Sequence, residues 1–167
     1  ETKTALAQLQ VTCVDCRDFP GVPPHGYSLK PFAMLNSSLA EVLYLDADNI
    51  CVRNPEELFV SKEYQETGAV FWPDFWKTAK ENPIWAIIGS DDFDIHEQES
   101  GQVLINKEKC WKELNLCMYF NYRYDIYYKL LLGDKDTFKF AWMACNTPFH
   151  MIATGIATLG YEDETTG

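Results

Sequence analysis

Two aspartates, Asp46 and Asp48, are separated by the small residue Ala47 and follow the apolar run at residues 42–45. Such a run is typical of a strand that is covered on both faces, and ligands of open α/β sheets bind beyond the carboxyl ends of strands. Two hard carboxylates suit Mn²⁺ or Mg²⁺, which keep water and substrate phosphates as further ligands. The pattern predicts a metal site at Asp46 and Asp48, with Ala47 leaving room for a ligand near the backbone. The alternative is a pair of ordinary turn residues, where aspartate is common.

The charge balance narrows the class of substrate. The chain has 25 acidic and 14 basic residues, a net charge of −11. Nucleic-acid binding needs clustered lysine and arginine, and no such cluster exists, so a nucleic-acid partner is not expected. A phosphate ester would need a divalent cation or a few placed lysines. Aspartate-nucleophile phosphatases also place two aspartates after an apolar strand, but they want a threonine where Ile50 stands.

The surrounding elements must position the aspartates. With 167 residues and 47% hydrophobic content, the chain fits one domain with a real core, residues 1–167. Helices are expected from the caps Ser28, Asn54 and Asp134 and over residues 107–132. Strands are expected at residues 9–14, 41–46, 68–72, 102–106 and 148–152, and a loop at 91–99. Strands alternating with helices predict an α/β sheet with crossover connections.

Cysteine usage leaves the compartment open. Cys13 and Cys16 form a lone C-x-x-C without a second ligand pair, which does not favour zinc. The six cysteines fit disulfides of a secretory-pathway domain or free buried thiols equally well.

Four motifs in order carry a family resemblance. They are Tyr27-Ser-Leu-Lys-Pro-Phe-Ala33, Glu41-Val-Leu-Tyr-Leu-Asp-Ala-Asp-Asn-Ile50, Glu99-Ser-Gly-Gln-Val-Leu-Ile105 and Gly133-Asp-Lys-Asp-Thr-Phe138. Together they resemble the fungal Golgi α-mannosyltransferase family (the terminal α-1,3-mannosyltransferase group, glycosyltransferase family 71) and, more distantly, glycogenin-like glycosyltransferases. The resemblance covers residues 9–160.

The resemblance implies a fold and an activity. The fold would be the GT-A nucleotide-diphospho-sugar transferase fold, incomplete in this chain, with a mixed, mostly parallel sheet flanked by helices. The activity would be Mn²⁺-dependent, retaining transfer of mannose from GDP-mannose to a mannose hydroxyl of a protein-linked glycan. The location would be the lumenal face of the Golgi membrane, with the membrane anchor outside this segment.

The resemblance also assigns donor-binding residues. Asp46 and Asp48 match the metal motif, and Lys30 matches a lysine that lies near the donor. Ser100 and Gly101 match a tight turn against the donor sugar, in which Glu99 replaces the usual asparagine.

An acidic segment beside the reacting carbon is matched by Asp134, Lys135 and Asp136, with Lys135 where relatives often have glutamine. Asp134 and Asp136 are the catalytic candidates, and Lys135 is a donor contact. Trp72, whose ring suits a sugar face, and Asp74 are candidates for binding the acceptor or a sugar.

The metal shell is expected to be incomplete. Relatives complete it with a late histidine, whereas the late histidine here, His150, falls in an expected strand. Two other functions therefore stay open: a hexosyltransferase that uses UDP-glucose or UDP-galactose, and an inactive or truncated relative.

Overall fold

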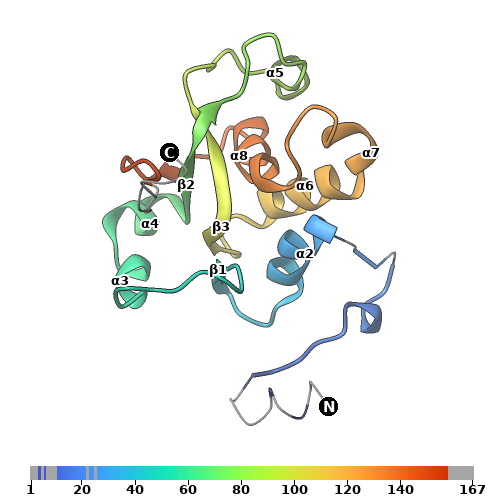
Figure 1. Ribbon diagram of the computed structural model, residues 1–167, viewed down its shortest axis with the longest axis vertical. Coiled ribbons are helices and arrows are strands. Elements are labelled where there is room, and N and C mark those ends of the chain that lie inside the picture. The colour runs from blue at the N-terminus through green and yellow to red at the C-terminus, as the bar shows by residue number, and fades with distance from the viewer. Residues whose placement is uncertain (1–3, 5, 7–10, 22, 25, 158–167) are drawn as a thin grey trace, which may run out of the picture.

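A four-stranded sheet forms the centre of the computed structural model, which describes residues 4, 6, 11–21, 23–24 and 26–157 (Figure 1). The strand order is β1-β3-β2-β4. The strands are β1 (Glu41–Leu45), β2 (Ala69–Lys77), β3 (His96–Asn106) and β4 (His150–Met151).

The directions of the strands correct one expectation. Within the described residues β3 pairs antiparallel with both β1 and β2, and β2 pairs parallel with the short β4. A mixed sheet flanked by helices is confirmed, but the expectation that it is mostly parallel is wrong for this part of the chain. The reason is that β3 inserts between β1 and β2 and runs opposite to both, although β1 and β2 keep the common direction that a crossover predicts.

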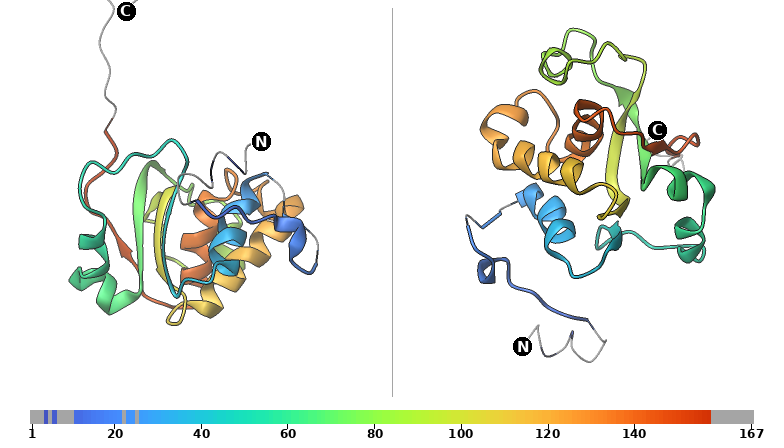
Figure 2. Two further views of the ribbon diagram at one scale, coloured as in Figure 1. Left: turned by 90° about the horizontal axis from the view of Figure 1, so that it is seen from below. Right: turned by 180° about the vertical axis from the view of Figure 1, so that it is seen from behind.

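Helices cover both faces of this sheet (Figure 2). Short 3₁₀ turns occur at η1 (Cys16–Asp18) and η2 (Gly26–Ser28). The α-helices are α2 (Leu29–Asn36), α3 (Glu56–Phe59), α4 (Lys62–Thr67), α5 (Ile84–Ile88), α6 (Trp111–Tyr122), α7 (Tyr124–Tyr127) and α8 (Lys135–Ala144).

The helices expected after Ser28, Asn54 and Asp134 are therefore present. The helical region expected at 107–132 begins only at Trp111, and it breaks at Arg123.

Two other expectations are corrected. Residues 11–14 of the strand expected at 9–14 have no regular structure, and residues 9 and 10 lie outside the described part. The loop expected at 91–99 ends early because β3 begins at His96, and the side chains of Glu97 and Gln98 hydrogen-bond to Lys135 and Lys139 of helix α8.

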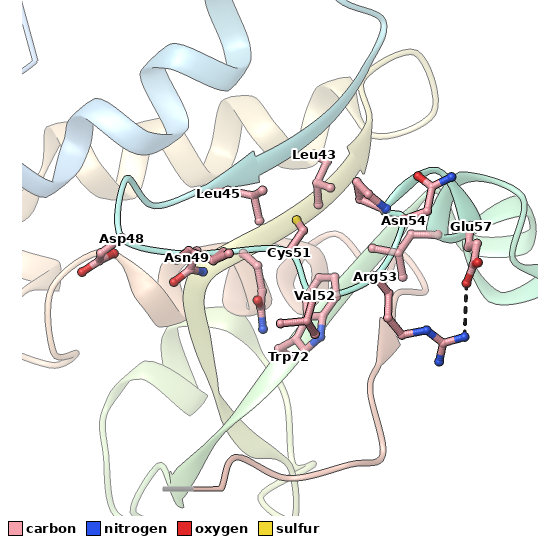
Figure 3. Close-up of a pocket in the computed structure, with 14 residues that line it drawn as sticks. Leu43, Leu45, Asp48, Asn49, Cys51, Val52, Arg53, Asn54, Glu57 and Trp72 are labelled. Carbon is pink, nitrogen blue, oxygen red and sulfur yellow. Dashed lines mark ion pairs between the residues drawn. The ribbon is translucent and has the colours of Figure 1, made fainter. Parts of the chain in front are cut away.

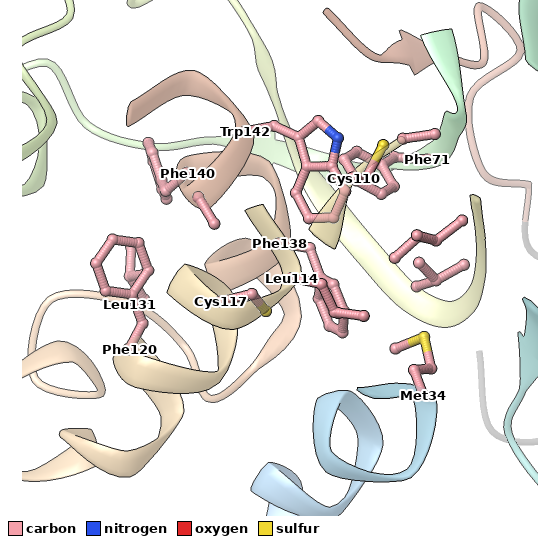
Figure 4. Packing of buried hydrophobic residues seen from close by; sticks show 14 of the residues in the cluster. Met34, Phe71, Cys110, Leu114, Cys117, Phe120, Leu131, Phe138, Phe140 and Trp142 are labelled. Carbon is pink, nitrogen blue, oxygen red and sulfur yellow. The ribbon is translucent and has the colours of Figure 1, made fainter. Parts of the chain in front are cut away.

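The sheet separates two apolar clusters, and alternate strand residues enter each. On one face Phe71, Val103 and Ile105 pack against α2, α6 and α8, and Figure 4 shows Phe71 beside Trp142 of α8 in this cluster. On the other face Val70 and Leu104 pack with residues from α3 and α4. The sheet is thus buried on both sides, which holds the end of β1 at a fixed place.

The described cysteines are free thiols, with Cys110 and Cys117 buried and Cys13 and Cys51 exposed. Of the two alternatives left open, the structure therefore contains free thiols. None of the described helices is both long and apolar enough to cross a bilayer.

Candidate functional site

Asp46 lies directly after β1, and both of its carboxylate oxygens are engaged. Lys30, in the first turn of α2, donates from Nζ to Oδ2 at 2.8 Å, and the Tyr44 hydroxyl donates to Oδ1 at 2.7 Å. The Asp46 N–H donates to the Gly101 carbonyl at 2.8 Å, which ties the end of β1 to β3. Burial acts to raise the pKa of Asp46, but the Lys30 and Tyr44 hydrogen bonds outweigh it and lower that pKa. Asp46 is therefore an anion at neutral pH.

Lys30 joins this aspartate to two further motifs. Its Nζ lies 3.2 Å from Ser100 Oγ, 3.4 Å from the Ser100 carbonyl and 4.0 Å from Asp134 Oδ2. Ser100 Oγ in turn donates to Asp134 Oδ2 at 3.2 Å. Burial raises the pKa of Asp134, although Lys30 and Ser100 oppose that rise. Four predicted site residues from separate parts of the chain, Lys30, Asp46, Ser100 and Asp134, thus meet around one ammonium group.

Asp134 stands at the N-cap position of α8, as expected, but its side chain makes no capping hydrogen bond. It points instead to Ser100 and Lys30. A buried carboxylate that leaves its helix end uncapped is better explained by a role in this cluster than by capping.

Asp48 is exposed on the loop that follows β1, together with Ala47. It lines a cavity of about 510 Å³, and Figure 3 shows it beside Asn49 at one end of a wall that contains Leu45 and Trp72. Burial of Tyr44 and its hydrogen bond to Asp46 raise the tyrosine pKa, and the charges of Asp134 and Asp48 add to that rise. The Asp48 charge therefore adds to the negative field around Tyr44.

The donor set suits a hard divalent cation. Asp46 and Asp48 offer carboxylate oxygens, of which Asp46 is held ionised. Within residues 11–21, 23–24 and 26–157, no group of three or more His, Cys, Asp or Glu side chains is placed to hold a metal ion. His150 lies in β4, at the opposite edge of the sheet from β1. A metal at the two aspartates would thus need ligands from water, from a substrate or from residues outside the described part.

Ser100 and Gly101 lie within strand β3, not in the tight turn that the resemblance implied, and Gly101 permits a close approach beside Asp46. Its carbonyl also accepts a hydrogen bond from Asn49 Nδ2 at 2.6 Å, and its N–H donates to Glu99 Oε1 at 2.7 Å. A Cβ at this position would lie 3.0 Å from Asn49 Nδ2 and 3.1 Å from Glu99 Oε1. Asn49 was not among the sequence candidates, although its place directly after the aspartate pair is a usable signal.

Lys135 and Asp74, both sequence candidates, form an ion pair with each other. Lys135 Nζ also pairs with Glu97 Oε2 at 2.7 Å. Burial lowers the pKa of Lys135, but these two carboxylates more than reverse that and raise it to about 12. Glu97 was missed because its partner comes from a distant helix. Trp72 is half-buried in the same strand as Asp74.

Asp136 is placed apart from the Lys30 cluster. Its side chain is 1% exposed and accepts from Lys139 Nζ at 2.9 Å and from the Gln98 N–H at 2.9 Å. Burial raises the pKa of Asp136 and lowers that of Lys139. This geometry is that of a buried ion pair that fastens α8 to β3.

A cavity of about 450 Å³ opens beside the cluster. Lys30, Glu99, Ser100, Asp134 and Lys135 contribute its polar lining, and Tyr27, Tyr128, Leu131, Leu132 and Gly133 complete it. It lies within the size range of small-molecule sites. A polar ligand here would contact two lysines, Lys30 and Lys135, and several hydrogen-bonding groups.

Comparisons with known proteins agree with these features. A mannosyltransferase family model matches residues 1–98 and 90–166. Alpha-1,2-mannosyltransferase MNN22 of Candida albicans is 33% identical to the chain over 84% of the chain and 31% of the relative. Alpha-1,2-mannosyltransferase MNN23 of Candida albicans is 28% identical over 96% of the chain and 35% of the relative. Alpha-1,2-mannosyltransferase MNN5 of Saccharomyces cerevisiae is 28% identical over 81% of the chain and 33% of the relative. The chain spans about a third of the length of these relatives.

Proposed function

Because this chain belongs to the mannosyltransferase family, as its motifs indicated, we propose that it is the donor-binding part of an α-mannosyltransferase. It would transfer mannose from a nucleotide-sugar donor to a mannose hydroxyl of a protein-linked glycan. The names of the relatives favour an α-1,2 linkage, whereas the resemblance drawn from the motifs was to the terminal α-1,3 group.

One observation carries the proposal. The Lys30 ammonium contacts Asp46 and Ser100 and lies 4.0 Å from Asp134, so three separate motifs converge on one point. An isolated pair of turn aspartates would need no such convergence. A cation between carboxylates on an acidic protein suits a ligand that combines phosphate with hydroxyl groups.

The proposed donor is GDP-mannose, with its diphosphate near Lys30 and the two metal aspartates. Mn²⁺ or Mg²⁺ held by Asp46 and Asp48 would supply Lewis-acid stabilisation of the charge that develops on the diphosphate. Lys30 would orient the phosphates and keep Asp46 ionised. The mannose would occupy the cavity of Ser100 and Asp134.

The proposed transfer is balanced without an added reactant. The bond between sugar carbon 1 and the diphosphate oxygen breaks, and carbon 1 bonds to the acceptor oxygen with retained configuration. The proton of the acceptor hydroxyl leaves with the released nucleotide. Asp134 would accept a hydrogen bond from the donor sugar and hold it for the attack. Asp136 would act indirectly, by holding α8 in place.

The test is a donor panel with full-length protein. GDP-mannose, UDP-glucose and UDP-galactose are each supplied with Mn²⁺, and released nucleotide and product linkage are measured. We expect transfer with GDP-mannose, lost in the Asp46→Asn/Asp48→Asn double variant and kept in the exposed control Asp91→Asn. Full Mn²⁺-dependent transfer by the double variant would refute the metal assignment.

Two outcomes would favour the alternatives. Turnover of a UDP-sugar alone would identify the protein as a different hexosyltransferase. If calorimetry shows no heat with Mn²⁺ and the protein also binds no nucleotide, the result would favour an inactive relative. We further propose a lumenal Golgi location with a membrane anchor outside the described helices, to be tested by microscopy of the tagged full-length protein.

A further inference from the structure

A second cavity, of about 480 Å³, lies on the other side of Glu99 from the Lys30 cavity. Its walls come from β2, β3, the loop after β1 and residues 152–156. The polar and aromatic lining is Asn49, Trp72, Asp74, Phe75, Glu99, Gln102 and Thr154. It shares Glu99 with the Lys30 cavity, and it shares Asn49, Trp72 and Gln102 with the cavity that Asp48 lines.

The charge of this lining excludes a phosphate ligand. It contains two carboxylates and two amides but neither lysine nor arginine. A phosphate would be repelled by Glu99, since Lys135 already offsets the charge of Asp74, whereas a neutral ligand rich in hydroxyls can donate to both carboxylates. The rings of Trp72 and Phe75 offer apolar faces for the C–H surface of a sugar.

Glu99 lines both cavities, so its carboxylate lies at their boundary. Its Oε1 accepts the Gly101 N–H at 2.7 Å, which fixes its direction. No lysine or arginine pairs with Glu99 within the described part of the chain, although the neighbouring Glu97 and Asp74 share Lys135. A fixed anion without a cationic partner retains acceptor capacity for a ligand.

We propose that the second cavity binds the acceptor mannose and that Glu99 accepts a hydrogen bond from an acceptor hydroxyl next to the one that attacks. This inference rests on the proposed mannosyl transfer, whose bond changes are those given above. Glu99 takes no proton. It fixes the acceptor ring so that the attacking oxygen faces the donor sugar across the boundary between the cavities.

The test separates acceptor binding from donor binding. The full-length enzyme is assayed for transfer to methyl α-mannopyranoside and for GDP release from GDP-mannose in water without acceptor. Glu99→Gln keeps the size of the side chain and removes its charge. We expect an acceptor KM raised about tenfold, as loss of one charge-assisted hydrogen bond predicts, and a clearly smaller change in the donor KM for hydrolysis, because Glu99 also lines the Lys30 cavity.

The matched control is Glu108→Gln, the same chemical change at an exposed position just after β3. It should leave both kinetic constants unchanged. Trp72→Phe supplies an independent binding measurement, because it should remove the change in tryptophan fluorescence that methyl α-mannopyranoside causes in the presence of GDP. A fluorescence change of wild-type size in Trp72→Phe would place the acceptor elsewhere and overturn the inference.

The outcomes distinguish this inference from the proposed function. A wild-type enzyme without any mannosyl transfer overturns the function itself. A wild-type enzyme that transfers mannose, together with a Glu99→Gln variant that behaves like Glu108→Gln, overturns the inference alone. A Glu99→Gln variant that loses hydrolysis as strongly as transfer would assign Glu99 to the donor and also overturn the inference.

Discussion

Replacing Lys139 with methionine would remove one partner of the buried ion pair within α8, whose two side chains both hydrogen-bond to β3. Lys139 is 0% exposed and Asp136 1%, and the Lys139 ammonium also donates to the His96 carbonyl at 2.9 Å. Methionine fills much of the same volume but leaves the Asp136 carboxylate with the Gln98 N–H and with Lys135 at 3.9 Å. Breaking a buried pair from one side costs about 3–5 kcal/mol.

The cost must depend on pH. In the variant, burial raises the pKa of Asp136 further above its unfolded value, so the folded state binds the proton more tightly and stability recovers as the pH falls. Protonating an aspartate of unfolded pKa about 3.9 costs about 4 kcal/mol at pH 7 and about 1.5 kcal/mol at pH 5, from 1.36 kcal/mol per unit. We therefore expect a deficit of about 3–4 kcal/mol at pH 7 that shrinks to about 1–2 kcal/mol at pH 5.

Urea unfolding followed by circular dichroism at several pH values measures this deficit. Lys62→Met, at an exposed lysine 3.8 Å from Glu66, is the matched control and should change stability by less than about 0.5 kcal/mol. The second change Asp136→Asn should restore most of the loss in Lys139→Met, because it removes the unpaired charge. A deficit that stays constant between pH 5 and pH 8 would mean that Asp136 already holds its proton in the wild-type protein and would refute this account.

Three further predictions concern the candidate site and the thiols. Lys30→Met should raise the donor KM about tenfold or more, the loss of a charged contact. The same variant should also move the acid-unfolding midpoint to higher pH, because it removes the hydrogen bond that lowers the pKa of Asp46. The stability from that lowered pKa is present above the unfolded pKa of Asp46 and is lost as the pH falls through the folded pKa. An unchanged midpoint would contradict this prediction. Gly101→Ala should destabilise by about 1–2 kcal/mol in urea unfolding and slow transfer, since the new methyl group displaces Glu99. Iodoacetamide should label exposed Cys51 rapidly, whereas it should label Cys117, whose pKa is raised by burial, only on unfolding. Peptide mass spectrometry measures the order of labelling, and the opposite order would contradict this prediction.

The strand that delivers Asp46 could be predicted from sequence because its signal is local. Residues 42–45 are continuously apolar, and between two helical layers the structure buries Val42 and half-buries the other three. The contact between Lys30 and Asp46 could not be predicted from a local signal. It depends on how α2 packs beside β1, and the sequence indicated it only through resemblance to a family.

The start of β3 could not be predicted because its residues are locally polar. Residues 96–99 have the composition of a loop. In the folded protein, however, the Gln98 N–H donates to Asp136 and Glu97 pairs with Lys135, and both partners lie on α8. Since β3 was expected to begin later, its place between β1 and β2 was missed, and with it the antiparallel pairing. Glu99 was treated as a departure from a motif, although the structure places it at the boundary between two cavities.

The central position of β3 has a consequence for how this protein can change in evolution. Successive residues of the strand face opposite sides, with Ser100 toward Lys30 and Asp134 and Glu99 at the boundary of the two cavities. Inserting or deleting one residue between Gly101 and Asn106 would shift Glu99 and Ser100 by one position relative to the part of β3 that stays paired with β1 and would exchange these sides. Lineages of this protein should therefore vary the length of the loops before β3 freely but keep the spacing within the strand constant.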